Sequence, residues 1–301
     1  MAEHTAASGA SMEAELRSQP DVWQQAVDMK AEQALLPAPG ARVAAIGCGT
    51  SWFMAQAYAA RREAAGLGVT DAFAASEAFL GRERGYDAVV AITRSGTTTE
   101  VLELVAQIRG RVRTVGIVGD PSSPFTDAVD EAIALPFADE SSVVQTRFAT
   151  TSLAFLRSSL GEDVSTAIAQ ASEAIRASLP EHLVGSEQYT FLGSGWSVGL
   201  AHEAALKMRE ASQSWTESYP AKEYRHGPIS IAAPNRVTWI FGEAPAGLAD
   251  EVLSTGAHFE TAPVDPMADL VRAQRVALER AQRAGLDPDS PRNLSRSVIL
   301  A

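Results

Sequence analysis

Residues 43–51 are VAAIGCGTS, an apolar run that ends in a Gly-x-Gly turn and continues into small hydroxyl residues. The same pattern returns in the second half of the chain as YTFLGSGWS, residues 189–197. A short apolar segment followed by helical periodicity is typical of a buried parallel strand that leads into a helix. The repeat therefore predicts a duplicated α/β unit, with one copy in each half of the chain.

Other strand-like runs surround these two segments. Apolar runs at 88–92, 115–118 and 132–135 alternate with segments of helical periodicity, and the run that starts at Ala88 recurs from Arg236. Such alternation indicates a parallel sheet with helices on both faces. We therefore expect an α/β fold of two tandem doubly wound parallel-sheet subdomains, each an α/β/α sandwich, with an N-terminal helical arm and a C-terminal tail.

Helix breakers divide the chain into three parts. A helix predicted at about 21–35 ends at Pro37-Ala-Pro39-Gly40, and a helical region of about 144–178 ends near Pro180. We predict an N-terminal arm and helix over 1–36, a first subdomain with the anion-binding turn over 37–180, and a second subdomain with the tail over 181–301.

Composition excludes several classes of protein. The chain has 301 residues, of which 46% are hydrophobic and 21% charged, as in an ordinary globular protein. A net charge of −12 argues against a nucleic-acid partner. The single cysteine, Cys48, excludes an internal disulfide and favours a cytoplasmic location. The sequence has neither a signal peptide pattern nor a membrane-spanning apolar stretch, so we expect no membrane partner.

A hydroxyl-rich turn follows the strand-like run at 88–92. Residues 93–99 are TRSGTTT, and five hydroxyl side chains exceed the single one that an ordinary helix N-cap requires. Gly96 lets the backbone approach an anion, and the first turn of the next helix adds free N–H groups. Thr50 and Ser51 end the neighbouring strand-turn unit and are expected to join the same phosphate site. The second half has GEAPAG, residues 242–247, in place of this turn, so one phosphate site is predicted.

The Gly-x-Gly turn is not a dinucleotide fingerprint. Trp52 occupies the position of the third glycine in the Gly-x-Gly-x-x-Gly pattern. We expect no dinucleotide and no other cofactor.

A stripe of charged residues marks one helix of the second half. Glu203, Lys207 and Glu210 have i, i+4, i+7 spacing, which places them on one helix face. A lysine one turn from each glutamate favours ionised carboxylates, as a general base requires. An exposed row of helix ion pairs gives the same spacing and is the alternative explanation.

His226 is presented by a His-Gly-Pro turn, where it is suited to transfer a proton or to open a sugar ring, although a lone histidine is often structural. The chain has no H-x-x-x-H motif, no cysteine pair and no Asp-rich loop. We therefore predict no metal site.

Together, six segments in a fixed order resemble the tandem SIS (sugar isomerase) family, most closely the isomerase half of glucosamine-6-phosphate synthase. The segments are 12–20 (MEAELRSQP), 47–51 (GCGTS), 95–98 (SGTT), 143–151 (VVQTRFATT), 203–228 (EAALKMRE to HGP) and 291–298 (PRNLSRSV). Their order covers almost the whole chain.

The resemblance assigns roles by position. It implies that the 6-phosphate of a sugar is bound by Ser51, Thr93, Arg94, Ser95 and Thr98, and that the sugar lies against Val143, Gln145 and Arg296. It also implies that Glu210 moves a proton between C1 and C2 with support from Glu203 and Lys207. A homodimer is implied, in which His226 comes from the neighbouring subunit.

Three departures separate the chain from the synthase. We expect no glutaminase domain, because nothing near Met1 offers an N-terminal cysteine nucleophile. Arg296 stands where the synthase has lysine, and a guanidinium does not form an imine with a keto sugar. Thr93 and Arg94 replace serine and glutamine, which adds a fixed cation that either strengthens phosphate binding or contacts another substrate group.

The resemblance thus implies an isomerase or deaminase of an amino-sugar 6-phosphate, of the glucosamine 6-phosphate/fructose 6-phosphate type, with Glu210 as the C2 base. One alternative is a lyase that eliminates the 3-hydroxyl of N-acetylglucosamine 6-phosphate. The other is a non-catalytic sugar-phosphate sensor, although a sensor has no use for the base at Glu210.

Overall fold

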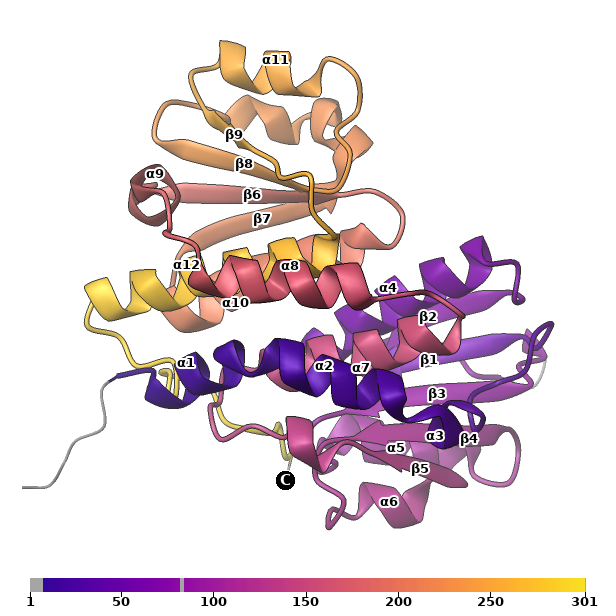
Figure 1. Ribbon diagram of the computed structural model, residues 1–301. Coiled ribbons are helices and arrows are strands. Elements are labelled where there is room, and N and C mark those ends of the chain that lie inside the picture. Colours follow the sequence, from indigo (N-terminus) through magenta and orange to yellow (C-terminus); the bar gives the residue numbers. More distant parts are fainter. Residues whose placement is uncertain (1–7, 82–83, 301) are drawn as a thin grey trace, which may run out of the picture.

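The computed structural model describes residues 8–81 and 84–300 (Figure 1). Two fully parallel sheets form its frame, with strand orders β2-β1-β3-β4-β5 and β7-β6-β8-β9. The strands are β1 (Val43–Gly47), β2 (Thr70–Ala74), β3 (Ala88–Thr93), β4 (Arg113–Val118), β5 (Glu131–Ala134), β6 (Gln188–Gly193), β7 (Trp215–Pro220), β8 (Arg236–Phe241) and β9 (His258–Glu260).

The helices connect these strands, precede the first strand and follow the last one. They are α1 (Ala10–Arg17), α2 (Gln19–Asp28), α3 (Lys30–Gln33), α4 (Thr50–Ala64), α5 (Thr99–Ile108), α6 (Phe125–Ala128), α7 (Arg147–Ser159), α8 (Ser165–Arg176), α9 (Glu181–Gly185), α10 (Ser197–Ser212), α11 (Leu248–Ser254) and α12 (Pro266–Arg283). Short 3₁₀ turns include η4 (Ala221–His226) and η5 (Pro228–Ile231).

The two sheets repeat one topology. β1 pairs with β2 on one side and β3 on the other, and β6 pairs in the same way with β7 and β8. The repeat seen at residues 43–51 and 189–197 therefore marks equivalent central strands. The predicted α/β fold of two parallel-sheet units is confirmed.

Helices cover both faces of each sheet (Figure 1). Ala44 and Ile46 of β1 pack toward α5, whereas Val43 and Ala45 point into a larger core. This alternation follows from the two-residue period of a strand. The larger core lies between the sheets and joins residues of both halves through α2, α4, α7, α8, α10 and α12.

Some boundaries differ from the prediction. The expected helix at 21–35 is broken at Met29, whose ψ of 59° is not helical. The helical region of 144–178 is divided into α7 and α8 at Gly161, which has a φ of +83°. The edge strands β2, β7 and β9 were missed, because each is only partly buried and lacks a continuous apolar run.

The described helices include none that combines the length and the apolar character needed to cross a bilayer.

Candidate functional site

A cavity of about 180 Å³ opens at the carboxyl ends of β1 and β3. The strand order reverses between these two strands, and open parallel sheets bind ligands at such a crevice. All of the predicted site residues except Glu203 and His226 line the cavity. The predicted residues that line it are Thr50, Ser51, Thr93, Arg94, Ser95, Thr98, Val143, Gln145, Lys207, Glu210 and Arg296.

The turn between β3 and α5 is tight and rich in donors. Gly96 has a φ of +63°, and a Cβ added there would lie 1.9 Å from Ser123 Oγ, so no other residue fits. Thr98 is the N-cap of α5, yet its side chain makes no capping hydrogen bond. An ordinary N-cap therefore does not account for this hydroxyl, which lines the cavity instead.

The turn between β1 and α4 lies beside it. A Cβ added to Gly47 would lie 2.6 Å from the backbone carbonyl carbon of Ser51, so the glycine allows the helix to begin close to the strand. Thr50 and Ser51 are buried and line the cavity. The amino ends of α4 and α5 thus meet at one cavity, and their dipoles and free N–H groups favour an anion.

Arg94 belongs to the turn between β3 and α5, lines the cavity and is buried. Its guanidinium donates hydrogen bonds to the carbonyl oxygens of Ser142 at 2.9 Å, Val143 at 3.3 Å and Arg296 at 2.7 Å. Burial lowers the pKa of Arg94, while the carboxylate of Glu140 opposes that effect. The fixed cation therefore holds the 142–143 segment and the C-terminal tail against the cavity.

The C-terminal tail closes one side of the cavity. Arg296 is held by both carboxylate oxygens of Asp139, at 2.6 and 2.7 Å. Ser297 Oγ accepts a hydrogen bond from Thr97 Oγ1 at 3.0 Å, and Thr99 N donates to Val298 O at 3.2 Å. Ser297 was not among the predicted site residues, although the serines on both sides of Arg296 in a matched segment were an available signal.

The charged stripe of α10 is buried, so the alternative of an exposed row of ion pairs is wrong. Glu203 and Lys207 are 0% and 1% exposed, and Glu210 keeps 20% of its side chain accessible. Lys207 Nζ lies 3.6 Å from Glu203 Oε1 and forms a direct ion pair with Glu210. Lys207 and Glu210 line the cavity, whereas Glu203 lies behind them.

Glu203 and Glu210 differ in burial, and burial changes the protonation of Glu203. Burial raises the pKa of Glu203 to about 8. The positive charge of Lys207 opposes this shift, and the negative charge of Glu210 adds to it. Burial disfavours the charged form of Lys207, but both glutamates outweigh this and raise its pKa. The expectation that Lys207 keeps both carboxylates ionised is therefore wrong for Glu203, which retains its proton near neutral pH.

We expect Glu203 to make stability fall as pH rises. Its carboxyl group ionises near pH 4.5 when unfolded and near pH 8 when folded, so the folded chain binds one more proton between these values. A Glu203→Gln variant lacks this proton, and its stability should fall less steeply, by up to about 1.4 kcal/mol per pH unit. Urea denaturation at several pH values in this window measures both slopes, and equal slopes would refute the assignment.

Glu210 borders open space on two sides. It lines the 180 Å³ cavity and also a second hollow of about 430 Å³, together with Leu206, Arg209 and Leu294. A carboxylate in this position can reach a molecule held in the cavity while its pair with Lys207 fixes its direction.

His226 lies away from the cavity. It ends η4 and is exposed, next to Gly227 with a φ of +131°. Within one chain it therefore does not meet the stripe on α10.

The cavity offers few metal ligands. Among the described residues that line it, Cys48 and Glu210 are the only thiol and carboxylate, and no imidazole is present. Transition-metal sites usually combine three or four such groups. The hydroxyl, amide and ammonium groups are instead suited to a polar anionic molecule.

No protein-family model matches the chain. Glutamine–fructose-6-phosphate aminotransferase (isomerizing) of Sulfurisphaera tokodaii is 28% identical over 295 residues, which is 86% of this chain and 50% of the relative. The chain therefore spans about half the length of the curated relatives it matches.

Solved structures match over nearly the whole chain. Glucosamine-6-phosphate deaminase of Thermotoga maritima has a TM-score of 0.76 at 24% identity, covering 95% of this chain and 99% of the other. Tagatose-6-phosphate ketose/aldose isomerase of Escherichia coli has a TM-score of 0.77 at 18% identity, covering 94% and 96%. These likenesses confirm the fold, and the resemblance to sugar isomerase proteins predicted from the sequence is confirmed as well.

Proposed function

We propose that the chain is an isomerase or deaminase of an amino-sugar 6-phosphate, with Glu210 as the base at C2. One observation carries the proposal: a single cavity joins the anion-favouring turns of the first half to a carboxylate on α10 of the second half. Phosphate binding at Ser51, Ser95 and Thr98 would direct the sugar chain toward Glu210.

The chemistry requires only proton transfers and water. Glu210 removes the C2 proton of the open-chain sugar, and the resulting enediol or enolamine takes a proton at C1. With a 2-hydroxyl the product is the ketose. With a 2-amino group it is an imine, which water hydrolyses to the ketose with release of ammonia. Lys207 lines the cavity and would stabilise negative charge that develops on the substrate oxygen.

The tail supports deamination over synthesis. Arg296 stands in the position of the synthase lysine, and its Nη2 donates to both carboxylate oxygens of Asp139, which also balance its charge. A guanidinium keeps its proton and is a poor nucleophile, so this residue would hold the tail in place and would not form an imine. The similarity to a glucosamine-6-phosphate deaminase over 99% of that chain agrees with this assignment.

We also propose a homodimer in which His226 reaches the cavity of the second copy. Its exposed position at the end of η4, outside its own cavity, supports a role between subunits. The cytoplasmic location stays a prediction from the sequence.

The products distinguish the proposed reaction from its alternatives. The full chain is incubated separately with glucosamine 6-phosphate, N-acetylglucosamine 6-phosphate and fructose 6-phosphate, and NMR follows aldose–ketose interconversion, ammonia release and loss of water. Formation of ammonia and fructose 6-phosphate from glucosamine 6-phosphate supports a deaminase, and conversion of fructose 6-phosphate to its aldose supports an isomerase. Loss of the 3-hydroxyl would identify a lyase, and the absence of any reaction together with sugar-phosphate binding would identify a sensor.

Removal of hydroxyls from the turn should weaken phosphate binding. We expect Ser95→Ala and Thr98→Ala each to raise the Kd for fructose 6-phosphate by about 10-fold or more, because a hydrogen bond to a charged group contributes about 1.5–3 kcal/mol. Calorimetry in a Glu210→Gln background avoids turnover. Ser122→Ala, at an exposed serine of the neighbouring turn, is the matched control. Unchanged affinity in both variants would place the phosphate elsewhere.

A further inference from the structure

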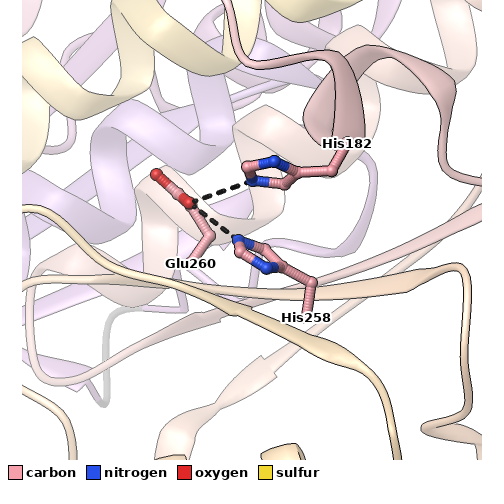
Figure 2. A group of neighbouring side chains, drawn as sticks. All are labelled: His182, His258 and Glu260. Carbon is pink, nitrogen blue, oxygen red and sulfur yellow. Dashed lines mark hydrogen bonds and ion pairs between the residues drawn. The ribbon is translucent and has the colours of Figure 1, made fainter.

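Three side chains that the proposed reaction does not use meet at one corner of the second sheet. His182 comes from α9, and His258 and Glu260 come from β9 (Figure 2). His258 Nε2 lies 3.1 Å and His182 Nε2 lies 3.9 Å from the same oxygen, Glu260 Oε2. The ligand atoms of all three lie within 4.8 Å of one another, so small rotations of the two partly exposed histidine side chains can bring all three onto one ion.

The fold places these residues together from distant segments. His258 and Glu260 are two residues apart on β9, so their side chains leave the same face of the strand. β9 is the edge strand of its sheet, and α9 immediately precedes the central strand β6. The cluster therefore lies near the start of β6, whereas the 180 Å³ cavity lies at the carboxyl ends of β1 and β3.

A second layer of charges fixes Glu260 and balances the site. Arg272 binds Glu260 Oε1, which leaves Oε2 directed at the two histidines, as Figure 2 shows for the three side chains. Arg272 also pairs with Asp269 Oδ1 at 2.7 Å, and Asp269 accepts a hydrogen bond from Trp239 Nε1 at 3.0 Å. Two carboxylates and one guanidinium give a formal charge of −2 + 1 = −1. The site is therefore negatively charged, which favours a divalent cation, and Arg272 already holds the Glu260 carboxylate in a fixed orientation.

We propose that His182, His258 and Glu260 bind a divalent transition-metal ion, with zinc as the best match. Two imidazole nitrogens and one carboxylate oxygen are a typical zinc donor set, whereas magnesium and calcium prefer oxygen ligands. The side chains of His182 and His258 are 46% and 38% exposed, so water can fill a fourth position. The ion would link α9 to the edge strand β9 and would stabilise the second half of the chain.

The spacing rules applied to the sequence did not indicate this site. Such rules recognise ligands that share one helix or one loop. These ligands come from the short helix α9 and from the edge strand β9, which was not predicted. The prediction of no metal remains untested for the sugar-phosphate cavity.

Zinc binding by the full chain tests the proposal. Protein treated with a chelator is dialysed to equilibrium against zinc chloride, with His258→Ala and His202→Gln as matched histidine variants. His202 lies on α10 and bonds Ser218, away from the cluster. We expect one zinc per chain in the wild type and in His202→Gln, and binding at least about 10-fold weaker in His258→Ala.

Two further measurements guard against adventitious binding and loss of fold. Cobalt(II) in the same site should give visible absorption typical of four-coordination in the wild type but not in His258→Ala. Zinc should raise Tm only where the site is intact. Equal zinc binding in wild type and His258→Ala, or none in the wild type, would overturn the proposal. His258→Ala should leave turnover of the sugar phosphate unchanged, so this test and that of the reaction can fail separately.

Discussion

Replacement of Glu210 by glutamine should lower proton exchange at C2 of the substrate by about 10²–10⁴-fold. The amide has nearly the shape of the carboxylate but cannot accept a proton at neutral pH. Glu210 is the carboxylate that lines the cavity, whereas Glu203 lies behind it and keeps its own proton because burial raises its pKa to about 8. No second base is therefore available on α10 to replace it.

Two controls separate chemistry from folding in this variant. Glu173→Gln makes the same change at an exposed position of α8 and should leave exchange at the wild-type rate. Fructose 6-phosphate should bind Glu210→Gln with an affinity within a few-fold of the wild type, because the turns that would hold the phosphate are untouched. Exchange that persists in a folded Glu210→Gln protein would refute the role of this base.

Replacement of Lys207 by methionine should produce the largest loss of stability. Lys207 is 1% exposed and is the cation between Glu203 and Glu210. Removal of one partner of a buried ion pair typically costs about 3–5 kcal/mol, because the remaining charge, here that of Glu210, loses its counterion. We expect a loss of this size in the free energy of unfolding, measured by urea denaturation near neutral pH.

A double-mutant cycle tests the origin of that loss. Glu210→Gln combined with Lys207→Met removes both members of the ion pair, and the two changes should show a coupling energy of about 0.5–3 kcal/mol. Lys222→Met, at an exposed lysine of η4, should change stability by less than about 0.5 kcal/mol. If Lys207→Met were as stable as Lys222→Met, the buried network would not contribute as described.

The sequence predicts the parts of this fold that depend on local patterns. β1, β3 and β4 contain continuous apolar runs and β8 repeats the pattern of β3, so all four were located within a residue or two. The edge strand β9 is too short and too exposed to produce such a run, although it supplies His258 and Glu260. Hydrophobic periodicity and strand propensity reveal a strand only where its residues are consistently buried. They therefore do not locate edge strands that are only partly buried.

The same limit applies to the site. Spacing placed Lys207 and Glu210 on one helix face, but only packing of α10 against both halves of the core decides that Glu203 is fully buried and neutral near pH 7. The bond from Thr97 to Ser297 joins residues 200 positions apart, so a local pattern around Ser297 can single out this residue but not its partner.

Deuterium exchange at C2 of glucosamine 6-phosphate in D₂O tests the central claim most directly. The reaction proposed for Glu210 predicts that the wild-type chain introduces deuterium at C2 of the remaining substrate or at C1 of the ketose formed, and that Glu210→Gln does so at least about 100-fold more slowly. Sugar phosphate that binds the wild-type protein, yet remains free of deuterium at both carbons, would contradict it.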